Sequence, residues 1–162
     1  MAGAPEPIDP DRMAETIDHV AVTRLQQAYA DGVTRRDWPA VAALFLPDAV
    51  VTLDLVTRPP MEHVGPEALT SFVAAAIERF DFFEFVILNA HIELWPGDDR
   101  SAATARVFMC ELRHDPAEGE RSEAFGLYRD TYRKVDGTWR IAARRYRSMA
   151  RFPAGEVFPL DT

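Results

Sequence analysis

The sequence contains a single cysteine, Cys110, among its 162 residues. One thiol cannot form an internal disulfide, and it excludes metal sites that are built from several cysteines. The sequence also lacks any apolar run near the ~20 residues that a membrane-spanning helix needs. Its first residues, MAGAPEPIDPDR, have neither the basic start nor the apolar core of a secretory signal. We therefore expect a cytoplasmic protein that does not span a membrane.

Positive charge is scarce as well, because 18 lysines and arginines stand against 26 aspartates and glutamates, for a formal net charge of −8. Nucleic-acid binding gains its affinity from cationic side chains that neutralise phosphates, so this balance argues against a nucleic-acid partner. The length fits one domain that is large enough to bury a core. We expect this domain at residues 18–150, with an N-terminal tail at 1–17 and a C-terminal tail at 151–162.

Three segments in the first half of the chain predict helices. An apolar stripe made by Val22, Leu25, Tyr29 and Val33 predicts an amphipathic helix over residues 18–36. Asp37, with a proline two residues later, is typical of a helix N-cap and predicts a short second helix. A third helix is predicted to begin at the Gly-Pro pair of residues 65–66, and its wide apolar face must pack against another element.

The rest of the chain is rich in β-forming residues. A β-branched run at 49–57 predicts one strand, and four longer runs follow at 82–95, 101–114, 122–135 and 138–149. Short turns separate the four long runs, which therefore predict an antiparallel meander. An Asp-Gly pair between the last two runs is the strongest short-range hairpin signal. Helices followed by strands indicate an α+β domain with its helices on one face of the sheet.

Several motifs together resemble the SnoaL-like branch of the nuclear-transport-factor-2 (NTF2-like) superfamily. The specific ones are LPDAVV at residues 46–51 and YRDTYRKVDGTWRI at residues 128–141, and the resemblance covers about residues 18–150. It implies a cone in which a strongly curved antiparallel sheet wraps three helices around a largely apolar pocket, usually in a dimer. The superfamily includes scytalone dehydratase, ketosteroid isomerase, polyketide cyclases and members with no known chemistry. The function must therefore come from the site.

The acid and base residues of the dehydratase type do not carry over to this chain. By the resemblance, their aspartate near the end of the first helix falls on Thr34, and the tyrosine before it falls on Val33. A tyrosine of the first strand falls on Leu53, and a histidine falls on Phe85. Only Tyr128, at a polar position of the third long run, keeps a titratable group. Proton transfer needs a base within reach of the substrate, which neither Thr34 nor Phe85 can be.

The alternation of side chains along each strand predicts which residues face the pocket. From this alternation and the matched positions, we expect the ligand to contact Tyr29, Val33, Thr34, Leu53, Phe85, Asn89, Cys110, Trp139 and Arg145. On the last strand the same rule places Arg144 in water if no bulge intervenes. Asp130 and Arg145 then form an inward pair, which is either a structural ion pair or part of the site.

Three residues are candidates for chemistry in this pocket. Tyr128 would donate a hydroxyl, and either His114 or Asp130 would accept a proton. His114 can also be a polar residue at a solvated turn, and Cys110 either a nucleophile or a small buried apolar group. No two histidines share a helix at ligand spacing or lie in one short run, so we expect no metal and no cofactor.

Two classes of function fit these observations. One is a dehydratase, isomerase or cyclase that acts on an apolar, ring-containing small molecule. The other is a non-catalytic module that binds a hydrophobic ligand, or a companion subunit like the small subunit of a ring-hydroxylating dioxygenase. The outer face of the run at 82–95 is predicted to be apolar through Val86, Leu88, Ala90, Ile92 and Leu94. Such a face indicates a homodimer interface or packing under the C-terminal tail.

Overall fold

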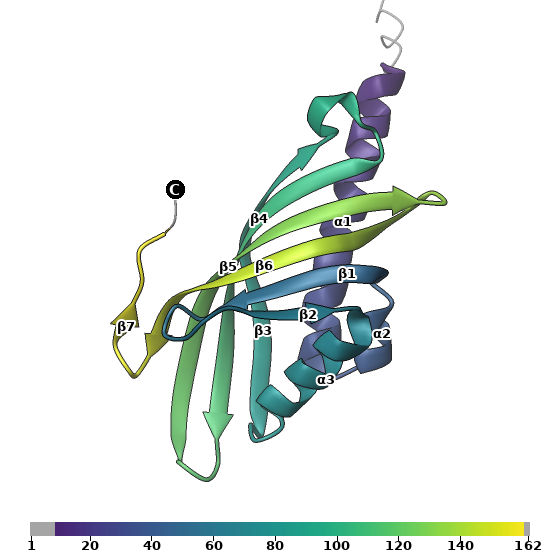
Figure 1. Ribbon diagram of the computed structural model, residues 1–162. Helices are drawn as coiled ribbons and strands as arrows, with labels where there is room; N and C mark the ends of the chain where they lie inside the picture. Colours follow the sequence, from purple (N-terminus) through teal and green to yellow (C-terminus); the bar gives the residue numbers. More distant parts are fainter. Residues whose placement is uncertain (1–8, 161–162) are drawn as a thin grey trace, which may run out of the picture.

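The computed structural model describes residues 9–160 of the chain. Three helices lie on one side of a seven-stranded sheet that curves around them without closing (Figure 1). The helices are α1 (Pro10–Arg35), α2 (Trp38–Ala42) and α3 (Pro66–Ile77), with a short 3₁₀ helix η1 (Pro96–Asp98). The strands are β1 (Phe45–Asp54), β2 (Met61–Val64), β3 (Phe82–Leu94), β4 (Ala102–Asp115), β5 (Glu120–Val135), β6 (Thr138–Phe152) and β7 (Glu156–Val157). The predicted α+β cone is confirmed.

The order of the strands in the sheet is β2-β1-β6-β5-β4-β3, and β7 pairs with β6. Strands β3 to β6 form the predicted antiparallel meander. Strand β1 runs parallel to β6, so the sheet is mixed, whereas we expected an antiparallel one. The reason is topological: after β1 and β2 the chain crosses through α3 to the far edge of the sheet, and successive hairpins bring β6 back beside β1 in the same direction.

The ends of the elements follow local sequence signals. Asp37 caps α2 as predicted, because its Oδ1 accepts a hydrogen bond from the Ala40 backbone at 3.2 Å. Gly65 precedes α3 with a φ of 84°, a conformation that glycine adopts without strain. Helix α1 begins at Pro10, so residues 10–17, which we expected as a tail, are helical. Residues 1–8 and 161–162 lie outside the described part, and the domain boundaries stay a prediction.

Two β-bulges decide which side chains face the helices. In β3, Ile87 pairs with Met109 and Asn89 pairs with Phe108, so that Leu88 is an extra residue. A second bulge lies in β6. Thr131 of β5 pairs with Ala143 and the next residue, Tyr132, pairs with Ile141, so that Ala142 is an extra residue. An extra residue reverses the alternation of all side chains beyond it. The sequence-based alternation is therefore correct before each bulge and wrong after it.

The predicted apolar outer face of β3 is wrong for this reason. Ile92 and Leu94 lie beyond the bulge and pack against the core, whereas Leu88 is 55% exposed. The five apolar residues of this strand consequently do not form one outward surface. The homodimer stays a prediction, but this face no longer supports it. None of the described helices is long and apolar enough to cross a membrane.

Asp18 attaches α1 to the sheet beside the β5–β6 hairpin. It is 4% exposed, and its Oδ1 accepts hydrogen bonds from Lys134 Nζ at 2.7 Å and Trp139 Nε1 at 3.0 Å. Its Oδ2 accepts a third bond from Trp95 Nε1 at 3.2 Å. Burial alone would raise the pKa of Asp18, but these bonds and the Lys134 charge hold the pKa below its usual value. The carboxylate is therefore a structural anchor.

We expect Asp18→Asn to lower the free energy of unfolding at neutral pH by about 1.5–3 kcal/mol, the range for a hydrogen bond to a charged group. Because the folded pKa lies below the unfolded one, the carboxylate stabilises the fold above the unfolded pKa of about 4, and this contribution is lost as the pH falls through the folded pKa. Urea unfolding of both proteins at neutral and strongly acidic pH measures the effect. The gap between them should shrink in acid.

The matched control for this experiment is Asp31→Asn. Asp31 forms an exposed pair with Arg35 on the same helix, so its loss should change the unfolding curves little. A gap between wild type and Asp18→Asn that stays constant down to strongly acidic pH would show that the ionised carboxylate is not the stabilising species.

Candidate functional site

A cavity of about 250 Å³ lies between α1, α3 and the inner face of the sheet. Most of its wall is apolar and comes from Val33, Val51, Leu53, Leu55, Leu69, Phe72, Val73, Ala76, Ile77, Phe80 and Phe85. The polar part comes from Tyr29, Tyr128, Tyr146, Glu111 and five arginines. A mostly apolar cavity with a few convergent polar groups is the usual form of a small-molecule site.

The structure brings five of the predicted site residues together in this cavity, namely Tyr29, Val33, Leu53, Phe85 and Tyr128. Three of them pack as an aromatic cluster. The rings of Phe85 and Tyr128 are stacked with centroids 5.9 Å apart, and Tyr29 meets both rings edge-on at 5.4 and 6.2 Å. Alternation on β3 and β5 is undisturbed up to these positions, which is why the sequence placed them correctly. Their contact with a ligand stays a prediction.

The other predicted ligand residues lie elsewhere. Thr34 does not line the cavity, and its hydroxyl accepts a hydrogen bond from the Phe85 backbone at 3.0 Å, which joins α1 to β3. Trp139 points inward as expected but binds Asp18. Asn89 and Arg145 are exposed, so their predicted inward orientation is wrong, and the bulges at Leu88 and Ala142 are the cause.

Cys110 is buried but does not line the cavity. Burial, together with the charges of Glu123 and Glu111, raises the pKa of its thiol. The nucleophilic form of cysteine is the thiolate, which this environment disfavours. Of the two interpretations of Cys110, the structure supports a small buried apolar group.

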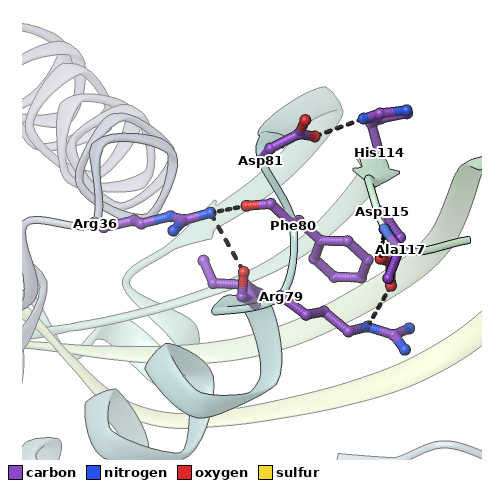
Figure 2. A network of polar contacts seen from close by, with 8 residues as sticks. Arg36, Arg79, Phe80, Asp81, His114, Asp115 and Ala117 are labelled. Carbon is purple, nitrogen blue, oxygen red and sulfur yellow. Dashed lines mark hydrogen bonds and ion pairs between the residues drawn. The ribbon is translucent and has the colours of Figure 1, made fainter. Parts of the chain in front are cut away.

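His114 lies outside the cavity at the end of β4, and its Nδ1 is 2.5 Å from Asp81 Oδ1 (Figure 2). The hydrogen bond and the charge of His114 lower the pKa of Asp81. Beside this pair, Arg36 donates to the Phe80 carbonyl oxygen at 2.5 Å, as Figure 2 shows. It also donates to the Ile77 carbonyl oxygen at 3.3 Å. His114 thus belongs to a polar network that fixes the segment after α3, and of its two interpretations the structure supports the polar residue outside the cavity.

Asp130 and Arg144 form a buried ion pair behind the aromatic cluster. Arg144 Nε is 2.8 Å from Asp130 Oδ1, Nη2 is 2.7 Å from Oδ2, and the side chains are 2% and 0% exposed. Tyr132 donates its hydroxyl to Oδ2 at 2.6 Å, and Gln26 Nε2 donates to that hydroxyl at 3.0 Å. The inward ion pair was predicted, but its cation is Arg144 and not Arg145. With both oxygens engaged, Asp130 holds Arg144 in place and does not face the cavity.

Arg144 itself lines the cavity. Its guanidinium carbon lies 4.2 Å from the Tyr29 ring centre and 4.1 Å from that of Tyr128. Burial alone would lower its pKa, but the Asp130 charge keeps the pKa well above its usual value. The Nη1 atom is buried and has no hydrogen-bond partner among the described residues. A buried donor without a partner is costly, and this one is covered by the surrounding side chains.

The three phenols of the cavity are held neutral. Burial is the largest cause that raises the pKa of Tyr29, Tyr128 and Tyr146, and the Glu111 charge raises all three further. Neutral phenols donate hydrogen bonds. Gly126 makes room for Tyr146, because a Cβ on this glycine would lie 2.1 Å from the Tyr146 ring.

Glu111 is the single carboxylate among the described lining residues. It pairs with Phe85 across β3 and β4, and its side chain is 20% exposed. Arg113 contacts it through Nε, 3.0 Å from Oε2, and through Nη2 at the same oxygen. No hydrogen bond of the described residues involves Oε1. Glu111 was not among the residues predicted from the sequence, because its place opposite Phe85 depends on the register of β3 and β4.

Within residues 9–160, no three His, Cys, Asp or Glu side chains converge in an arrangement that could hold a metal ion. The polar groups that line the cavity are phenols, guanidiniums and one carboxylate. Such a set can donate hydrogen bonds to a ligand oxygen and can exchange a proton with it. Together with the cone, it defines a protein with a small-molecule pocket.

Comparison with known proteins identifies the family. Residues 14–145 match the family described as "SnoaL-like domain", and the chain belongs to this family within the NTF2-like superfamily. No curated protein matches the chain significantly.

Solved structures share the fold at low sequence identity. A scytalone dehydratase-like protein from Novosphingobium aromaticivorans is 19% identical over 93% of both chains, with a TM-score of 0.74. The hexachlorocyclohexane dehydrochlorinase LinA-type3 from Novosphingobium barchaimii is 18% identical over 93% of this chain and 99% of its own, with a TM-score of 0.76. A protein of unknown function from Mycobacterium tuberculosis is 23% identical over 86% of this chain and 76% of its own, with a TM-score of 0.72.

Proposed function

We propose that this protein is an enzyme of the lyase or isomerase kind, which moves a proton on an apolar, ring-containing small molecule inside the cone. The observation that carries the proposal is the buried Arg144 guanidinium, which lies over the Tyr128 ring in the cavity wall. Two structures with the same fold are described as scytalone dehydratase-like and as a dehydrochlorinase, which supports a reaction of this kind.

In the proposed reaction, the Tyr128 hydroxyl and the Arg144 guanidinium donate hydrogen bonds to an oxygen of the ligand. Negative charge that develops on this oxygen is stabilised, because donors that the protein already holds in place need little reorganisation. Glu111 Oε1 accepts the proton from the adjacent carbon. Glu111 thus takes the role for which His114 and Asp130 were predicted, since His114 lies outside the cavity and Asp130 is engaged by Arg144.

The second candidate is a non-catalytic module that binds a hydrophobic ligand, or a companion subunit. It is supported by Thr34 and Phe85, which stand where related dehydratases keep an aspartate and a histidine. The carboxylate of Glu111 is also engaged by Arg113. The homodimer and the cytoplasmic location stay predictions under either candidate.

The substitution Tyr128→Phe separates the two candidates. Incorporation of solvent deuterium next to the carbonyl group of the probe 2-tetralone, followed by NMR, measures proton transfer, and a titration measures affinity. For an enzyme, we expect the exchange rate to fall by about a hundredfold while the dissociation constant changes little. For a binding module, exchange should not exceed that of buffer, and affinity should fall by the ~0.5–1.5 kcal/mol of one hydrogen bond.

Tyr146→Phe is the comparison variant, because it removes the hydroxyl of a second tyrosine in the same wall. The ring centres of Tyr146 and Tyr128 are 5.4 Å apart. We expect it to reduce exchange less than Tyr128→Phe does. Wild-type protein that binds cyclic ketones but catalyses no exchange on any of them would reject the enzymatic proposal and leave the binding module.

A further inference from the structure

The cavity is more positive than the protein around it. The chain carries a net charge of −8, yet five arginines and one glutamate line the cavity. Three of the arginines pair with carboxylates that lie outside the lining: Arg144 with Asp130, Arg79 with Asp115 and Arg151 with Glu156. Glu111 pairs with Arg113, so four carboxylates face five guanidiniums and one positive charge remains. The arginine without a carboxylate partner among the described residues is Arg58.

The arginines differ in exposure, which separates the bottom of the cavity from its mouth. Arg144 is 2% exposed and its charge is matched by Asp130. A second anion at this depth would lack a counter-charge and would be costly to bury. The other four side chains are partly or largely exposed. Arg113 and Arg151 are each 25% exposed, Arg79 is 61% exposed, and Arg58 is exposed as well. An anion near them keeps part of its hydration.

The four arginines at the mouth of the cavity, which are Arg58, Arg79, Arg113 and Arg151, form two groups. Arg151 Nη2 donates to the Leu55 carbonyl at 2.6 Å and Nη1 donates to Thr57 Oγ1 at 3.4 Å, so Arg151 is fixed to the segment that carries Arg58. This group contains the unmatched charge.

The second group flanks Phe80. Arg79 and Arg113 lie over its ring at 4.8 and 5.5 Å, and Figure 2 shows Arg79 extending past this ring toward Asp115. Both of these arginines already have carboxylate partners, Asp115 and Glu111. The first group has one carboxylate, Glu156, for its two arginines, so a ligand anion is favoured there.

We propose that the ligand is a ring compound that carries a carboxylate, and that this carboxylate lies at the mouth between Arg58 and Arg151 while the ring reaches toward Tyr128. The inference rests on the proposed function only in requiring that the cavity holds the ligand. A guanidinium fork matches the two oxygens of a carboxylate, and a partly exposed position keeps the desolvation cost low. A positive mouth on an acidic protein also draws anions toward the cavity.

Two probes of the same shape test this inference: 2-naphthoate, which is charged, and 2-naphthamide, which is neutral. Calorimetric titration at low and high salt measures their dissociation constants. We expect wild-type protein to bind the carboxylate several-fold to about tenfold more tightly at low salt, and this preference to decrease as salt screens the charges. Arg58→Gln should remove most of the preference and weaken the binding of the amide far less than that of the carboxylate.

Arg106→Gln is the matched control, because it changes the net charge equally at an exposed position that does not line the cavity. It should keep the preference. An amide that binds as tightly as the carboxylate to wild-type protein would overturn the inference and leave the proposed function standing. The substitution Val73→Trp fills the cavity and should abolish the binding of both probes. If both still bind to this variant, or if neither binds to wild-type protein, the cavity is not the ligand site. That result would overturn the inference and the proposed function together.

Discussion

Replacement of Asp130 by alanine is expected to lower the free energy of unfolding by about 3–5 kcal/mol, the range for a buried ion pair that loses one partner. The substitution leaves the guanidinium of Arg144 charged, 2% exposed and without its counter-ion. It also removes the acceptor of the Tyr132 hydroxyl. Urea unfolding at neutral pH, followed by circular dichroism, measures the loss.

The double variant Asp130→Leu with Arg144→Met shows whether the charge or the packing is responsible. It removes both charges and fills the space with apolar side chains, so most of the stability should return. A double variant that is as unstable as Asp130→Ala would contradict the explanation, because the cost would then come from lost volume and not from an unpaired charge.

The buried pair also shows how far the sequence predicts this site. Alternation along the third long run correctly turned Tyr128, Asp130 and Tyr132 inward, because β5 pairs with β4 without a register shift. The last strand contains two adjacent arginines, Arg144 and Arg145, and composition cannot distinguish them. The extra residue at Ala142 decides which one enters the core, and nothing in the local sequence marks that bulge.

The fold was easier to predict than the site, because its signals are local. The Asp37 cap, the Gly65 start of α3 and the tight turn at Asp136 each depend on neighbours in the sequence. The residues of the site depend on distant partners. Glu111 is recognised as a cavity residue only once its partner Phe85 is known, and His114 is excluded only by its contact with Asp81.

The substitution Glu111→Gln is expected to reduce proton exchange on 2-tetralone by about a thousandfold, within the range that a positioned general base contributes. The amide has nearly the shape of the carboxylate and can still accept a hydrogen bond from Arg113, but it cannot accept a proton. The affinity for 2-tetralone should therefore change far less than the rate. NMR detection of deuterium incorporation, together with a binding titration, measures both quantities on one variant.

His114→Asn is the control that distinguishes Glu111 from the other candidate base. His114 bonds to Asp81 outside the cavity, so its replacement should leave the exchange rate close to that of the wild-type protein. If His114→Asn loses the activity and Glu111→Gln keeps it, the acceptor is the histidine and the cavity wall does not contain the base. If Glu111→Gln loses the activity and His114→Asn keeps it, the proton acceptor is Glu111. The loss of rate is then due to a carboxylate that lines the same cavity as Tyr128 and Arg144.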